Sequence, residues 1–274
     1  MVKYEYCTLK FMKGARCVNV QETVAKVLVL VLVLNAASYS LAQIFGLMNK
    51  GVDIVTVREH SGEKAIYLIG GCQCRTIRPF EFLLDGLPED VAVYLVEYRN
   101  TGLDLDRAAN DVLLHIRAGG HSKVTFVAIS MGYQLAAMCQ SDESKIIALN
   151  PCIGKESLLL GIQRATLALP LGWLGLFVLG WASLLPVVKI NGEPYYSLQL
   201  LMDQFEAAAT DYDALAAPFQ PAVLALSRED NVTDNDALLN VVTNEPKVYW
   251  IDTIHFGFVD NGPLYRDAVA ENLS

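Results

Sequence analysis

From about residue 52 to its end, the sequence alternates short apolar runs with segments of helical pattern. Several of the runs are nearly continuous Val, Ile, Leu and Ala, which is typical of strands buried on both faces of a sheet. Strands that alternate with helices predict the α/β class, with a mostly parallel central sheet flanked by helices. The expected strands are residues 53–58, 65–69, 91–97, 124–129, 146–149, 222–226 and 247–251. The expected helices are residues 79–85, 104–117, 133–140, 235–241 and 263–273, the second of them capped by Asp104.

One interval is too long for an ordinary connection between neighbouring strands. The chain between the expected strands 146–149 and 222–226 contains a long apolar run, residues 165–188, and a helical pattern at 196–208. Connections inside compact domains usually span only a few residues. We therefore expect an apolar helical lid, about residues 155–217, inserted over one end of the sheet.

Another apolar run, residues 27–49, precedes the predicted sheet. It is uncharged and long enough to cross a bilayer as a helix. The segment ahead of it is mostly basic, whereas the whole chain carries a net charge of −9. A basic head, an apolar run and an acidic body are the order expected when the N-terminus stays in the cytoplasm and the body lies outside. The sequence thus divides into a head and apolar segment at 1–50 and a domain at 51–274.

Three interpretations of the run at 27–49 are open. It is an uncleaved membrane anchor, or a secretory signal with Ser40-Leu41-Ala42 as its cleavage site, or a buried element of a soluble enzyme. The long basic head favours the anchor, and hence a membrane contact with the domain outside the cytoplasm. The alternation of Val and Leu at 27–34 suits a buried strand, and hence a cytoplasmic soluble protein.

The composition excludes several functional classes. Charged residues are only 19% of the chain and no cluster of Lys and Arg is dense enough to follow a phosphate backbone, so nucleic acid is not an expected partner. The six cysteines form no CxxC pair and no zinc-ligand spacing. Since no phosphate loop or dinucleotide fingerprint occurs either, we expect no metal and no cofactor.

A serine stands where one expected strand meets its helix. The sequence there is Ala128-Ile129-Ser130-Met131-Gly132. A serine between small residues at such a junction can occupy a strained turn that lifts its hydroxyl clear of the sheet edge. Ser130 is therefore the candidate nucleophile, and its alternative role is to cap the following helix.

A nucleophilic serine needs a base, and an imidazole is suitable because its pKa lies near neutrality. Among the four histidines we favour His255, because it immediately follows the last expected strand and so lies at the same edge of the sheet as Ser130. The carboxylate that orients this base is expected in the loop after the strand 222–226. Asp230 is favoured there, with Asp234 and Glu229 as alternatives.

These residues resemble the α/β-hydrolase family, over the chain from about residue 52 to its end. The matching features are the turn at 128–132, the order Ser130, Asp230, His255, the stretch 227–234, Gly70-Gly71-Cys72-Gln73 and Tyr98-Arg99-Asn100-Thr101-Gly102. Gly70 and Ala128 depart from the histidine and glycine that are usual in the family. The resemblance implies a serine hydrolase in which backbone N–H groups of Met131 and Cys72 hold the developing oxyanion.

A triad of this kind also decides how the run at 165–188 is interpreted. A single membrane crossing there would put Ser130 on one side and His255 on the other, so the run belongs to the lid. Trp173, Phe177 and Trp181 are spaced so that they can face one side of a lid helix, where they either meet substrate or pack the lid against the core. An apolar lid indicates a lipophilic ester or acyl substrate, or docking at a bilayer surface. We therefore expect a lipase-like carboxylic ester hydrolase. The alternatives are a non-catalytic binding protein on the same fold and an acyltransferase that uses the same triad.

Overall fold

The structure is a computed structural model, and it describes Lys26 and residues 50–72, 74–99, 102–152, 198–208 and 218–273. The chain divides into two compact units, Met1–Leu41 and Ala42–Ser274, and the sheet with its flanking helices belongs to the second. The apolar runs at 27–49 and 165–188 lie outside the described residues, as do Trp173, Phe177 and Trp181. Within the residues described, no helix combines the length and the apolar character needed to span a bilayer.

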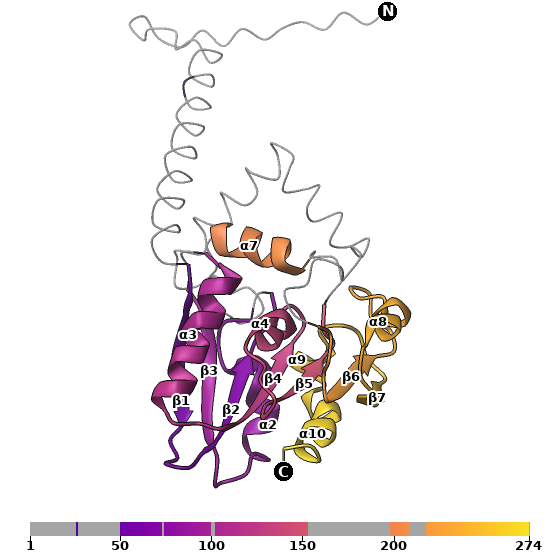
Figure 1. Cartoon of the computed structure of the whole chain (residues 1–274). Coiled ribbons are helices and arrows are strands. Elements are labelled where there is room, and N and C mark those ends of the chain that lie inside the picture. Colours follow the sequence, from indigo (N-terminus) through magenta and orange to yellow (C-terminus); the bar gives the residue numbers. More distant parts are fainter. Residues whose placement is uncertain are drawn as a thin grey trace, which may run out of the picture. The chain divides into compact units, whose positions relative to one another are not determined.

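In the described part of the chain, seven strands form one sheet, in the order β1-β3-β2-β4-β5-β6-β7. The strands are β1 (Val52–Arg58), β2 (Lys64–Ile69), β3 (Ala92–Tyr98), β4 (Lys123–Ile129), β5 (Lys145–Leu149), β6 (Val223–Ser227) and β7 (Lys247–Ile251). The edge strand β1 runs antiparallel to β3, and every other neighbouring pair is parallel (Figure 1). The predicted mostly parallel sheet is confirmed, and each strand ends within one residue of its predicted bounds.

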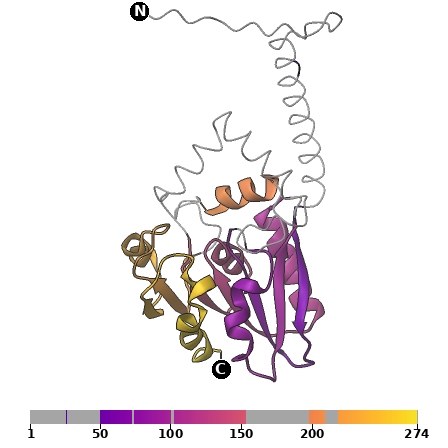
Figure 2. The ribbon, with the colours of Figure 1, turned by 180° about the vertical axis from the view of Figure 1, so that it is seen from behind.

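Helices cover both faces of this sheet, as Figures 1 and 2 show from opposite sides. The helices are η1 (Arg78–Phe80), α2 (Glu81–Leu84), α3 (Leu105–Ala118), α4 (Gly132–Met138), α7 (Leu198–Ala208), α8 (Asn235–Val241), α9 (Gly257–Asp260) and α10 (Gly262–Ala270). Residues of α3, α4, α7 and α8 share one apolar cluster, and those of η1, α2, α9 and α10 share the cluster on the other face. The helices thus separate into two layers with the sheet between them.

Of two predicted helices, one begins as expected and the other is divided in two. Asp104 caps α3 as predicted, because its carboxylate accepts a hydrogen bond from the backbone N–H of Arg107. The single helix predicted at 79–85 is instead the 3-10 turn η1 followed by the one-turn helix α2. The two meet at Phe80, whose φ of −113° and ψ of −1° lie outside the regular helical range.

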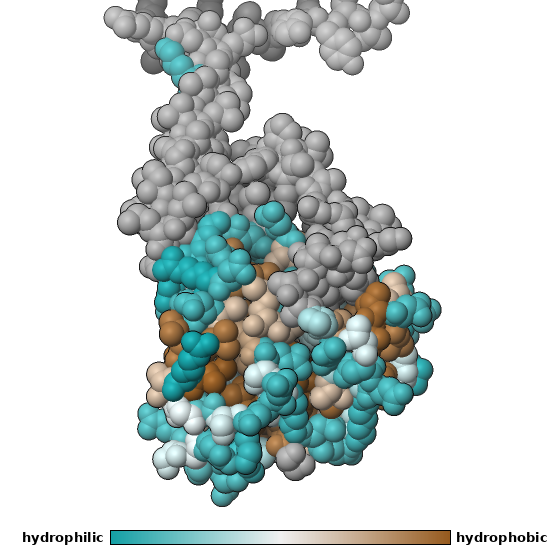
Figure 3. Space-filling view, in the orientation of Figure 1, coloured by the Kyte–Doolittle hydropathy of each residue, from teal (hydrophilic) through white to brown (hydrophobic). Residues whose placement is uncertain are grey.

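The central strands are buried on both faces, as their continuous apolar runs predict. Tyr67, Leu68 and Ile69 of β2 are consecutive and have no exposed surface. The edge strands are more exposed, and Val55 of β1 and Trp250 of β7 each keep about two fifths of their surface in solvent. Figure 3 shows hydrophobic residues gathered around α3 and beside α8 on one face, with hydrophilic residues around the lower rim. The loops that follow β4, β5 and β6 thus leave the buried part of the sheet.

Candidate active site

Ser130 lies in a sharp turn between β4 and α4. Its φ is +52°, in the left-handed region that costs a non-glycine residue roughly 1–3 kcal/mol. The neighbouring glycines make this turn possible. A Cβ on Gly132 would lie 2.5 Å from the carbonyl oxygen of Gly70, and a Cβ on Gly71 would lie 2.7 Å from the Cβ of Ser130. Ser130 therefore sits against the loop that follows β2, where any larger residue at these positions would push the backbone apart.

His255 meets this serine from the loop that follows β7. Its Nε2 lies 2.9 Å from Ser130 Oγ, although the two residues are 125 positions apart in the sequence. The imidazole has no exposed surface, and the ring of Phe256 stands edge-on against it at 4.9 Å between centroids. The loop is tightly folded, since a Cβ on Gly257 would overlap the hydroxyl of Thr253.

Asp230 contacts the other side of the same imidazole. Its Oδ2 lies 2.8 Å and its Oδ1 3.0 Å from His255 Nδ1. The carboxylate is buried, and Oδ1 also accepts hydrogen bonds of 2.8 Å from the backbone N–H groups of Val232 and Thr233. A buried carboxylate is stable only with such donors.

The two alternative carboxylates have other surroundings. Asp234 Oδ1 accepts from the backbone N–H groups of Asp236 and Ala237, so it caps α8. Glu229 is exposed, and its backbone N–H bonds to the carbonyl of Thr253. Among the three candidates, Asp230 is the one that the structure brings to His255.

The two predicted oxyanion donors lie beside the serine. Met131 follows Ser130 and precedes α4, and it is fully buried. Cys72 follows Gly71, the glycine that packs on Ser130. The two predicted donors therefore belong to two different loops, the turn of Ser130 and the loop after β2.

Two buried thiols near the serine, those of Cys72 and Cys152, act as hydrogen-bond donors, which the sequence did not predict. Burial raises the pKa of the Cys152 thiol to about 12, while side-chain hydrogen bonds with Thr233 and Ser130 act in the opposite direction. Burial also raises the pKa of the Cys72 thiol well above its ordinary value, with Cys152 and Cys74 nearby adding to the effect. Both thiols therefore stay protonated near neutral pH and can donate hydrogen bonds.

The helix α7 lies beyond this end of the sheet, above α4 in the views of Figures 1 and 2. Cys72 Sγ donates to the carbonyl of Gln204 at 3.4 Å and Cys152 Sγ to that of Ala208 at 3.9 Å. Gln134 of α4 donates to the carbonyl of Ala207. Ser130 keeps only 4% of its surface exposed. The helix belongs to the predicted insertion at 155–217, and in this structure the serine is covered.

A buried amide and a buried phenol complete the surroundings. Asn150 follows β5 with a φ of +45°, and its Nδ2 donates to the carbonyl of His255 at 2.7 Å. The hydroxyl of Tyr265 lies 3.0 Å from the same Nδ2 and 2.7 Å from Ser227 Oγ. The sequence signal that could have pointed to Asn150 is its position directly after an expected strand, because asparagine tolerates left-handed backbone.

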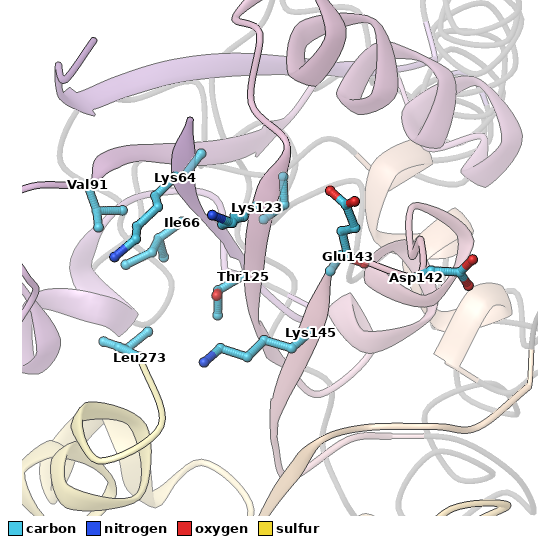
Figure 4. Close-up of a pocket in the computed structure, with 12 residues that line it drawn as sticks. Lys64, Ile66, Val91, Lys123, Thr125, Asp142, Glu143, Lys145 and Leu273 are labelled. Carbon is cyan, nitrogen blue, oxygen red and sulfur yellow. The ribbon is translucent and has the colours of Figure 1, made fainter. Parts of the chain in front are cut away.

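A separate pocket of about 280 Å³ opens at the opposite edge of the sheet, lined by the first residues of three parallel strands, Lys64, Lys123 and Lys145 (Figure 4). Because Ser130 follows the carboxyl end of β4 and Lys123 begins it, this pocket is a strand's length away from the serine.

Over the described ranges, no group of three or more His, Cys, Asp or Glu side chains is placed to hold a metal ion.

Comparison with known proteins gives structural likeness without sequence likeness. No family model and no curated protein matches the sequence. An esterase from Exiguobacterium antarcticum is similar in structure, with a TM-score of 0.61 and 14% identity over 81% of this chain and 96% of that one. A lipase-esterase related protein from Clostridium acetobutylicum has a TM-score of 0.55 and 14% identity over 81% and 98% of the two chains. A bromoperoxidase from Bacillus anthracis has a TM-score of 0.56 and 14% identity over 80% and 94%.

These likenesses extend over nearly the whole length of each known structure, and so they describe a complete domain. They include a bromoperoxidase as well as esterases, so the fold by itself does not choose the reaction. The mostly parallel seven-stranded sheet, its two helical layers and these structural neighbours agree with the family resemblance of the sequence: the chain has the α/β-hydrolase fold.

Proposed function

We propose that this protein is a serine hydrolase that cleaves an ester or acyl bond of a lipophilic substrate through a covalent acyl-enzyme. The observation that carries the proposal is the unbroken chain of hydrogen bonds from Ser130 Oγ through His255 to the carboxylate of Asp230. The names of two structural neighbours, an esterase and a lipase-esterase related protein, support an ester as the substrate class.

The hydrogen bonds assign the protons. An ionised carboxylate only accepts, so His255 Nδ1 carries the hydrogen that faces Asp230, and its Nε2 is left as the acceptor that faces Ser130. This tautomer is the one a general base needs. As Ser130 Oγ attacks the substrate carbonyl, its proton passes to Nε2, and Asp230 stabilises the imidazolium that forms.

The remaining steps use the same groups. The backbone N–H groups of Met131 and Cys72 bind the oxyanion of the tetrahedral intermediate. His255 returns the proton to the departing alcohol, which leaves an ester on Ser130. Water then attacks this ester with His255 again acting as base, and the serine and the acid product are released.

The covering of the site supports a lipophilic substrate. Ser130 is buried, and α7 bonds to Cys72 and to Gln134 of the neighbouring elements, so water has little access to the serine. In the proposal the insertion at 155–217 is a lid, and Trp173, Phe177 and Trp181 contact the acyl chain. In the same proposal, residues 27–49 form a membrane contact that keeps the protein near lipophilic substrates.

A fluorophosphonate probe tests the nucleophile. We expect the full chain to be labelled and to hydrolyse nitrophenyl esters, faster for medium acyl chains than for acetate, and Ser130→Ala to lose both properties while remaining folded. Ser122→Ala, which changes an exposed serine at the other edge of the sheet, is the matched control and keeps both. A folded wild-type protein that neither labels nor hydrolyses any ester would refute the proposal.

A further inference from the structure

The loop that carries His255 is held by three buried polar side chains from other elements. Asn150 follows β5, Ser227 ends β6 and Tyr265 lies in α10. Asn150, Ser227 and Tyr265 have no exposed surface. A buried polar group costs free energy unless it is hydrogen-bonded, so their bonding partners show what the group does.

The amide of Asn150 has only one orientation that fits its neighbours. The backbone N–H of Ser227 is a donor, so it faces Asn150 Oδ1, at 2.8 Å. The carbonyl of His255 is an acceptor, so it faces Asn150 Nδ2, at 2.7 Å. The second hydrogen of Nδ2 points to the hydroxyl oxygen of Tyr265, at 3.0 Å.

The two hydroxyl groups continue this chain in one direction. Ser227 Oγ donates to the carbonyl of Ile254 at 2.9 Å, so toward Tyr265 it is an acceptor. The hydroxyl of Tyr265 therefore donates to Ser227 Oγ at 2.7 Å and accepts from Asn150. Burial raises the pKa of Tyr265, so the phenol keeps the proton that it donates. Each of these donors has an acceptor.

The network ends on two consecutive peptide carbonyls, those of Ile254 and His255. Fixing both carbonyls fixes the backbone from which the His255 imidazole projects. The backbone of Asn150 is fixed in turn, because its N–H donates to the carbonyl of Ala225 in β6 at 2.8 Å. Left-handed backbone at Asn150, with a φ of +45°, directs its amide across the strand ends toward the loop.

We propose that Asn150, Ser227 and Tyr265 are positioning residues for the base: they hold the backbone of the His255 loop so that Nε2 stays within hydrogen-bond distance of Ser130 Oγ. This inference rests on the proposed function, since it assigns a role in that reaction. None of the three touches the reacting atoms. Their effect is on geometry, and a displacement of about 1 Å at a reacting group can cost about 100-fold in rate.

Tyr265→Phe is the most conservative test, because it removes one hydroxyl and keeps the buried ring. We expect kcat for ester hydrolysis to fall about 10- to 100-fold with KM nearly unchanged. The substitution also loosens the contact between His255 and Asp230, which destabilises the protonated form of His255. The acid limb of the pH profile of kcat/KM therefore moves to lower pH. Tyr67→Phe is the matched control: Tyr67 is equally buried, and its hydroxyl bonds to His115 of α3, outside the network.

A proton NMR spectrum separates this inference from the proposed function. The His255 Nδ1 hydrogen facing Asp230 gives a low-field resonance, and we expect Tyr265→Phe and Ser227→Ala to broaden or shift it while Tyr67→Phe leaves it unchanged. An inactive wild type would refute the proposed function alone. An active wild type in which Tyr265→Phe keeps kcat, the pH profile and this resonance would overturn the positioning role. A fall in kcat that Tyr67→Phe matches, at an equal loss of thermal stability, would overturn it too.

Discussion

Asp230 and Asp234 lie in one loop, but their hydrogen-bond partners show that they have different roles. Asp230 faces an imidazole on one side and two backbone N–H groups on the other. These donors stabilise the ionised carboxylate in a buried position. Asp234 faces the first turn of α8, where a carboxylate stabilises the helix.

Substituting the two aspartates separates these roles. Asp230→Asn keeps an acceptor for the backbone but places an amide N–H against His255, which favours the wrong tautomer. We expect kcat to fall about 10⁴-fold with little change in stability. Asp234→Ala removes the cap and is expected to lower the free energy of unfolding by about 1 kcal/mol with kcat retained. Urea unfolding and ester kinetics on both variants check this. Comparable activity in the two variants would show that Asp230 does not orient the base.

At the scale of elements, α7 is fastened to the domain at two places along its described length. Near its middle, the carboxylate of Asp203 accepts from the backbone N–H of Leu103 at 2.8 Å and pairs with Lys50 at 3.0 Å. In its second half, the carbonyls of Gln204 and Ala208 accept from the thiols of Cys72 and Cys152, and that of Ala207 accepts from the amide of Gln134. Thiol–carbonyl bonds are weak and the amide bond of Gln134 is between neutral groups, so the charged Asp203 is the strongest of these attachments.

Removing this attachment is expected to uncover the site thiols. In Asp203→Ala, Cys72 and Cys152 should react about 10- to 100-fold faster with an aromatic disulfide at pH 8, because a bond to a charged group holds a helix by roughly 1.5–3 kcal/mol. Peptide mass spectrometry of the labelled protein identifies the cysteines. Glu271→Ala, which removes an exposed carboxylate paired with Lys247 of β7, is the control. Equal reactivity of the two thiols in the parent and in Asp203→Ala would mean that Asp203 does not hold α7 over them.

At the scale of the whole molecule, the site is assembled by neighbouring strands of one sheet. Ser130 follows β4, Asn150 follows β5, Asp230 lies beyond β6 and His255 lies beyond β7, and these four strands are adjacent. Parallel strands deliver their carboxyl ends to a common edge.

Burial in the core of the domain keeps several tyrosines and thiols in their neutral form. Burial raises the pKa of Cys139 and of Cys152 to about 12, and it raises the pKa of Tyr98 and Tyr133.

These raised pKa values predict that the fold weakens in alkali. An unfolded thiol loses its proton near pH 9, whereas the buried thiol of Cys139 keeps it to about pH 12. Between these values the unfolded chain binds fewer protons, so the free energy of unfolding falls as pH rises, by up to about 1.4 kcal/mol per pH unit for each such group. Urea unfolding from pH 8 to 11 measures this slope. Cys139→Ala should have a shallower slope, and a stability that stays constant to pH 11 would contradict the prediction.

The sequence by itself determined the strands and two members of the site. Continuous apolar runs are a local signal, so each of the seven strands could be placed to within a residue. The small residues around Ser130 and the place of His255 after the last strand are also local features. Both point to one edge of a parallel sheet.

Only the tertiary structure decided among the carboxylates and revealed the support behind the histidine. Asp230, Asp234 and Glu229 are near neighbours in one loop, and backbone direction alone chooses which of them faces His255. Asn150 lies 105 positions from His255 and 115 from Tyr265, so no local pattern joins them. Hydrogen bonds between distant elements depend on how strands and helices pack, and that packing is a property of the whole fold.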